Sequence, residues 1–96
     1  MMIKFQKWNC NLTFSKYLND RTAIMLIDAD DGSPVAIASV NLPETAMDDD
    51  EIAIKDYSEN DGILEILVEN KIVSEPIRFV KSGYVEIPIC KLLINE

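Results

Sequence analysis

The loop at residues 28–33, Asp-Ala-Asp-Asp-Gly-Ser, places carboxylates at alternate positions, as calcium-binding loops do. An EF-hand loop that began at Asp28 would need an oxygen ligand at its fifth position, glycine at its sixth and glutamate at its twelfth. This chain has Gly32, Ser33 and Ser39 at those positions. Asp and Gly also supply ordinary turn chemistry, because glycine accepts a positive φ, so we interpret the loop as a hairpin turn and not as a metal site.

The sequence lacks residues that other common catalytic sites require. The sequence contains no histidine, which excludes Cys–His pairs, Ser-His-Asp triads and histidine-ligated metals. The carboxylate pairs Asp28/Asp30 and Asp48/Asp50 belong to polar loops, which lack the apolar pocket that would raise a carboxyl pKa toward neutrality. We therefore expect no catalytic residue, no cofactor and a non-enzymatic protein.

The acidic residues concentrate in the middle of the chain. Residues 22–61 hold eleven carboxylates and one lysine, whereas residues 1–21 hold four basic residues and one aspartate. If strands over 22–28, 35–41 and 51–55 run up, down and up, the acidic loops gather at two ends of the sheet. One end would hold Asp28, Asp30, Asp31, Asp56, Glu59 and Asp61, and the other would hold Glu44, Asp48, Asp49, Asp50 and Glu51.

Two roles suit these acidic ends. Carboxylate arrays could imitate DNA phosphates and occupy the basic groove of a restriction or CRISPR nuclease, with long-range steering that raises the association rate. The simpler interpretation is that polar loops and a net charge of −8 keep a small protein in solution. In either case the acidic surplus argues against direct nucleic-acid binding.

Trp8, together with Tyr17 and Tyr84, could form a small aromatic patch beside the basic residues near the start of the chain. Such a patch can stack bases or anchor a protein partner, although aromatic residues beside lysines are also ordinary sheet surface. Trp8 is therefore a candidate for partner binding.

These residues must be positioned by strands, and the clearest pair flanks the acidic turn. Thr22–Ile27 and Pro34–Val40 are apolar on both faces, which is typical of central strands. Ala36 and Ala38 are small, so we expect a helix to pack against them. The order of elements predicts an α+β fold in which a mostly antiparallel sheet has one helix, at about residues 59–70, packed on one face. The other predicted strands cover Ile3–Trp8, Leu12–Leu18 after a turn at Asn9–Asn11, Glu51–Lys55 with Ile52 and Ile54 inward, Ile77–Val80, and Tyr84–Leu92 at an edge or bulge because of Pro88.

The helix is predicted over Ser58–Asn70, because its apolar residues recur at helical spacing. Ser58 and Asp61 resemble a capping box at its start. The alternative takes Asp61-Gly62 as a hairpin turn. Ile66 widens the apolar stripe and would supply a homodimer contact if the sheet cannot cover it.

Length and composition set the class of protein. We expect the 96 residues to form one domain, residues 1–96, and no apolar run approaches the ~20 residues that span a bilayer. No apolar signal segment begins the chain, so we expect a cytoplasmic protein without membrane contact. Cys10 and Cys90 are expected to be reduced and buried as small apolar residues.

Three blocks carry a resemblance: TAIMLIDADDGSPVAIASVNLPE, IAIKDYSENDGILEILVENKIV and GYVEIPICKL. In that order they resemble a family of short uncharacterised proteins, known as a domain of unknown function, carried by conjugative elements and phages of gut bacteria. The resemblance spans roughly residues 20–93, which by length is a whole domain. It implies an accessory protein of a mobile element and assigns no functional residue.

The sequence thus favours a small accessory protein that acts by binding another protein. One alternative is an acidic, DNA-mimicking inhibitor of a host nuclease, and another is a structural component of a virion. An enzyme would need a carboxylate-only or metal-assisted site, which a stabilising shift with calcium, magnesium or manganese would reveal.

Overall fold

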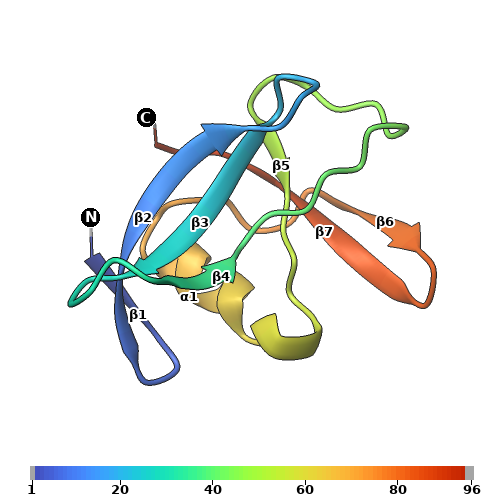
Figure 1. The fold of residues 1–96 in the computed structure, drawn as a ribbon. Helices are drawn as coiled ribbons and strands as arrows, with labels where there is room; N and C mark the ends of the chain where they lie inside the picture. Colours follow the sequence, from blue (N-terminus) through green and yellow to red (C-terminus); the bar gives the residue numbers. More distant parts are fainter. Residues whose placement is uncertain (1, 95–96) are drawn as a thin grey trace.

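The computed structural model describes residues 2–94, which form seven strands, a 3-10 turn and an α-helix (Figure 1). The elements in chain order are β1 (Met2–Phe5), β2 (Trp8–Lys16), β3 (Thr22–Asp28), β4 (Pro34–Ile37), β5 (Glu51–Ala53), η1 (Ser58–Asn60), α1 (Ile63–Glu69), β6 (Arg78–Ser82) and β7 (Val85–Lys91). Every strand pair is antiparallel. The predicted α+β fold, mostly antiparallel sheet with one helix, is confirmed.

The first four strands form one sheet in the order β1-β2-β3-β4. The first strand predicted over Ile3–Trp8 is too long, and the turn predicted at Asn9–Asn11 is wrong, because the chain already turns at residues 6–7. The earlier turn pairs Ile3 with Cys10, and both side chains are buried on the same face of the sheet. Burial of these two side chains therefore sets the register of the first hairpin.

The strand predicted over Pro34–Val40 ends early and is not central. β4 stops at Ile37 and is an edge of the first sheet, paired only with β3. Ala38 is fully buried, and Ser39 then forms a bridge with Ile54. The apolar residues that follow β4 are buried because the chain crosses to a second sheet.

The second sheet has three strands in the order β5-β7-β6. Pro88 was expected to mark an edge or a bulge, and the edge alternative is wrong, because β7 lies between the other two strands. Pro88 pairs with Phe79 in β6, and its carbonyl accepts a hydrogen bond from the Ile54 amide just beyond the end of β5. The central strand therefore tolerates a proline where its neighbour β5 has already ended.

β5 is buried on both faces, whereas we expected one face to be exposed. Ile52 and Ile54 point into the core as predicted, but Ala53 and Glu51 are also buried. Ala53 packs with Ile87 and Ile89 in a second cluster, which side chains of the 40–47 segment cover. The burial of the second face of β5 depends on the segment that follows β4. The alternation of residues within β5 could not predict this burial.

The predicted helix over Ser58–Asn70 is interrupted. η1 and α1 are separated by Asp61 and Gly62, and Gly62 has a φ of 94°, which suits glycine. The predicted capping box does not form, because the Oδ1 atom of Asp56 accepts the amides of Gly62 (3.1 Å) and Leu64 (3.0 Å). A carboxylate outside the predicted helix therefore caps it.

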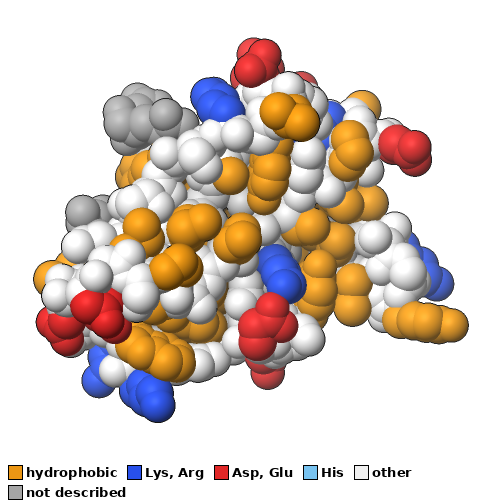
Figure 2. All heavy atoms as spheres, in the orientation of Figure 1, with side chains coloured by type: hydrophobic (Ala, Val, Ile, Leu, Met, Phe, Trp, Pro, Cys, Tyr) orange, Lys and Arg blue, Asp and Glu red, His pale blue; other side chains and the backbone are white. Residues whose placement is uncertain are grey.

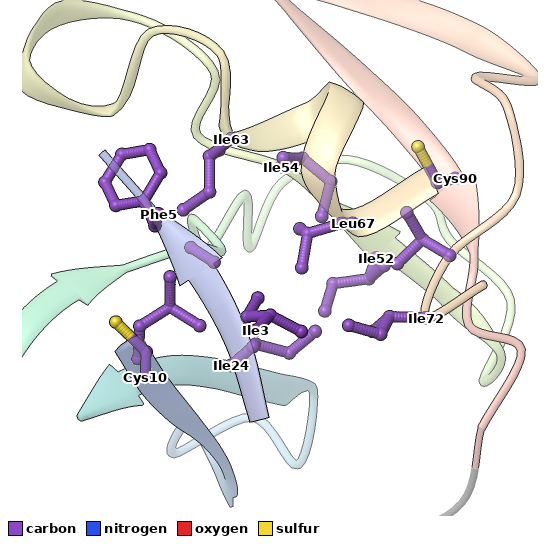
Figure 3. Packing of buried hydrophobic residues seen from close by; sticks show 13 residues of the cluster. Ile3, Phe5, Cys10, Ile24, Ile52, Ile54, Ile63, Leu67, Ile72 and Cys90 are labelled. Carbon is purple, nitrogen blue, oxygen red and sulfur yellow. The ribbon is translucent and has the colours of Figure 1, made fainter. Parts of the chain in front are cut away.

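The main core lies between α1, the inner face of the first sheet and β5 (Figure 3). Ile63 and Leu67 of α1 are fully buried beside Ile3 and Phe5, and the main strand contact of α1 is with β1. Ala38 is buried in the same cluster as Ile63 and Leu67 of α1, Ala36 packs against this cluster, and the Asn60 side chain of η1 donates to the Ile37 carbonyl at 2.7 Å.

Both cysteines are buried and free, as expected of small apolar residues. Burial raises the pKa of the Cys90 thiol to about 12 and also raises the pKa of Cys10. No helix within residues 2–94 has the length and apolar character that a membrane crossing requires.

Candidate interaction site

The acidic loop between β3 and β4 forms hydrogen bonds among its own residues. The Oδ1 atom of Asp28 accepts the Asp30 amide at 2.8 Å, and the Oδ1 atom of Asp31 accepts both the amide and the hydroxyl of Ser33. These bonds from Ser33 lower the pKa of Asp31. Nowhere in residues 2–94 are three Asp, Glu, Cys or His side chains placed to hold a metal ion. The side chains of Asp28 and Asp31 therefore stabilise the turn through these hydrogen bonds, and Asp30 is exposed.

The second acidic loop, residues 56–61, is also engaged locally. Asp56 caps α1, and Glu59 pairs with Lys55 at 2.6 Å. Glu59 is thereby held with a lowered pKa, and the pKa of Lys55 is raised for the same reason. Asp61, an exposed residue, forms no ion pair within the part of the chain that the structure describes.

At the opposite end, three of the four acidic residues 48–51 pair with two cations. The Lys91 ammonium lies 3.1 Å from Asp50, 3.6 Å from Asp48 and 3.9 Å from Glu51. The Glu51 carboxylate is buried, accepts the Asp48 amide at 2.9 Å and pairs with Arg78 at 2.9 Å. The Asp48 amide and then Arg78 lower the pKa of Glu51. Asp49, next in the run, is exposed and pairs with no described cation.

Two arginine side chains form hydrogen bonds with the backbone of the connection between β4 and β5. Arg21 donates to the carbonyls of Leu42 and Thr45, and Arg78 donates to the carbonyl of Ala46 at 2.7 Å. Neither role follows from the sequence, because each arginine lies more than 20 positions from its partner. The acidic connection is therefore part of the folded structure.

The acidic residues do not form one continuous track. The loop of Asp28–Asp31 and the loop of Asp56–Asp61 are joined by no hydrogen bond or ion pair, and Lys55 neutralises part of the second. On the face shown in Figure 2, red acidic side chains appear as separate groups, some beside blue basic ones. This arrangement suits a solvated surface better than a substitute for evenly spaced phosphates.

The predicted aromatic patch does not assemble. Trp8 is the first residue of β2, Tyr17 follows the last residue of the same strand, and Tyr84 belongs to the turn between β6 and β7. Trp8 is half-buried against the main core, with the Lys7 ammonium 5.1 Å from its ring. Its position indicates a packing residue with one face available to a cation.

An acidic groove runs beside α1. It encloses about 550 Å³, and Leu64 and Val68 of the helix form its apolar part. Its carboxylates come from the loop before the helix, from the helix and from the segment before β6: Asp56, Asp61, Glu65, Glu69 and Glu75. No lysine or arginine lines it, so the groove is a strongly negative surface.

The largest exposed apolar side chains of the second sheet gather on the β6–β7 hairpin. Ile77, Phe79 and Tyr84 are 47%, 57% and 106% exposed. Phe79 lies in β6, which bonds to β7 on one side and, within residues 2–94, has no strand paired along its other edge (Figure 1). The cross-strand pairs put Phe79, Pro88, Lys81 and Glu86 on one face of the hairpin. The hairpin therefore presents aromatic side chains and open backbone groups together.

No protein-family model, no curated protein and no solved structure matches this chain. The site must therefore be identified from geometry. Sequence reasoning missed Phe79 because its strand reads as ordinary half-buried sheet. Its exposure depends on where the second sheet ends, and strand alternation alone does not indicate that.

Proposed function

We propose that this chain is a small, non-enzymatic accessory protein of a phage or conjugative element, and that it acts by binding another protein. The observation that carries the proposal is the exposure of Phe79 and Tyr84 on the β6–β7 hairpin. Aromatic side chains are enriched in protein interfaces and often dominate their binding energy.

The backbone of the hairpin favours the same role. β6 is an open edge of the sheet as far as the described residues go, and an extended segment of a partner can add to such an edge through main-chain hydrogen bonds. Phe79 would then contribute a side-chain contact beside the new strand. Arg78 is held by Glu51 and the Ala46 carbonyl, so the base of the hairpin is braced before a partner arrives.

The biological setting rests on the resemblance of residues 20–93 to the mobile-element family. A cytoplasmic location fits that setting. Protein binding is favoured over imitation of DNA because most of the carboxylates in residues 22–61 are engaged by neighbouring amides or cations, including Asp31, Asp56, Glu59 and Glu51.

A capture experiment tests the proposal. The immobilised chain would be exposed to host lysate at low and high salt, alongside a Phe79→Ser/Tyr84→Ser variant. Leu18→Ser is the matched control, because Leu18 is 107% exposed and lies in the turn before β3. We expect a partner that survives high salt, is lost with the double variant and is kept by the control, since apolar contacts are not screened.

Two results would count against this surface. Capture that persists in the double variant would place binding elsewhere. Capture that is lost at high salt and in a variant carrying Asp48→Asn, Asp49→Asn and Asp50→Asn would instead favour the acidic-inhibitor alternative.

A further inference from the structure

The direction of the β7 backbone shows which groups of β6 are used within the sheet. The carbonyl of Pro88 in β7 accepts the Ile54 amide, so the backbone groups of Pro88 point toward β5. Backbone groups alternate in direction along a strand, so those of Ile87, the preceding residue, point toward β6. Ile87 pairs with Val80. The amide and carbonyl of Val80 are therefore bonded to β7.

The residues on either side of Val80, Phe79 and Lys81, direct their amides and carbonyls away from β7 by the same alternation. Within residues 2–94 no strand pairs along that edge, and no backbone hydrogen bond between described residues outside the strands uses these four groups. Both residues are exposed. Two donors and two acceptors at strand spacing match the main chain of one extended segment.

A groove lies beside this edge, on the face of the sheet that carries Val80. It encloses about 400 Å³ between β6 and residues 41–45, and Leu42, Pro43 and Val80 form its apolar part. Leu42 and Val80 pack against the second hydrophobic cluster, and Arg21 donates to the Leu42 carbonyl, so the fold holds both walls. A strand added to β6 would direct every second side chain toward this groove.

The other face of the edge carries a cation and an aromatic ring. Lys81 is exposed and forms no ion pair within the described part of the chain, although Glu86 is its cross-strand neighbour. Phe79 lies two residues away on the same face and is 57% exposed. Cross-strand pairs of opposite charge and of aromatic rings stabilise a sheet, so a carboxylate suits the first position and an aromatic side chain the second.

We propose that β6 binds an extended segment of a different protein as an added strand, and that this segment carries acidic, apolar and aromatic residues in succession. The acidic residue lies beside Lys81, the apolar residue enters the groove beside Val80, and the aromatic residue lies beside Phe79. This inference rests on the proposed function and names the chemistry of the partner segment.

The strands of this chain explain why the partner is a different protein. The described edge strands β1, β4 and β6 contain no carboxylate, and Glu51 of the remaining edge strand, β5, is buried. No edge strand of a second copy could therefore place an acidic side chain beside Lys81.

Amide chemical shifts of the isotopically labelled chain, followed as a peptide is added, test the inference directly. The probe is the peptide acetyl-Ser-Thr-Glu-Val-Tyr-Thr-Ser-amide. We expect shifts in residues 41–45 and 78–82 and a Kd of about 1 mM or lower. The same peptide with lysine in place of glutamate should bind about fivefold more weakly, because its ammonium meets Lys81.

Two substitutions of Lys81 separate its charge from its main chain. Lys81→Glu should reverse the preference, so that the lysine peptide binds about fivefold more tightly than the glutamate peptide. Lys81→Pro should abolish binding of both, because it removes an amide that β7 does not use and that an edge strand can lose. Lys4→Glu makes the same charge change at an exposed position of β1, another edge strand, and should leave both Kd values unchanged.

Three results would overturn the inference: equal binding of the two peptides to the wild type, shifts confined to other parts of the chain, or the same shifts without peptide as the chain is concentrated. If Lys81→Pro does not fold, the charge reversal with Lys81→Glu decides the question. Capture from lysate that depends on Phe79 and Tyr84, without peptide binding, would keep the proposed function and remove this inference. Peptide binding with the expected charge preference, without capture, would do the reverse.

Discussion

At the scale of single residues, the start of α1 depends on Asp56. Its carboxylate accepts two amides that would otherwise lack a partner in the first turn of the helix. We expect Asp56→Ala to lower the free energy of unfolding by about 1 kcal/mol, the usual cost of losing a side-chain cap. Urea denaturation of the two proteins gives this difference.

Asp61→Ala is the control for that measurement. It removes the same charge from the same loop, and Asp61 belongs to the capping box that the sequence predicts but the structure lacks. We expect its effect to stay within about 0.5 kcal/mol. Equal destabilisation by the two variants would show that charge near the helix, and not the cap, stabilises α1.

At the scale of elements, the buried Glu51 joins β5 to β6 and to the acidic connection. Its pKa is lowered in the folded chain, so its contribution to stability is present above the ordinary glutamate pKa of about 4.3 and is lost as pH falls through the folded value. We expect Glu51→Gln to be less stable than the wild type at pH 7 and the gap to narrow below about pH 4.

Chemical denaturation across this pH range tests the role of Glu51. Asp49→Asn is the control, because it removes one charge from the same run at an exposed position. We expect it to change stability little at pH 7. A gap for Glu51→Gln that stays constant from pH 7 to pH 3 would contradict the role of its charge.

The elements also mark how far the sequence can predict this fold. Alternation and apolar runs are local, so they place β3, β7 and the buried face of α1 close to where the structure has them. The division into two sheets depends on where the chain crosses after Ile37, which no local pattern encodes. For the same reason the acidic loops were recognised, but their partners Arg78 and Lys91, distant in the sequence, were not.

At the scale of the whole molecule, charge and apolar surface occupy different places. Many of the carboxylates lie in connections, where neighbouring amides and a few cations hold some of them. Several exposed apolar side chains lie on the two sheets: Met2 and Ile37 on the first and Phe79 on the second. The acidic connections and these exposed apolar side chains are therefore separate parts of the surface.

The most direct test of partner binding is amide hydrogen exchange of the chain, alone and with its captured partner. We predict that protection rises in residues 77–85, where β6 would gain a neighbouring strand, and that the outer face of the first sheet exchanges as before. Unchanged exchange in the hairpin, with new protection in the acidic loops or along α1, would contradict the account.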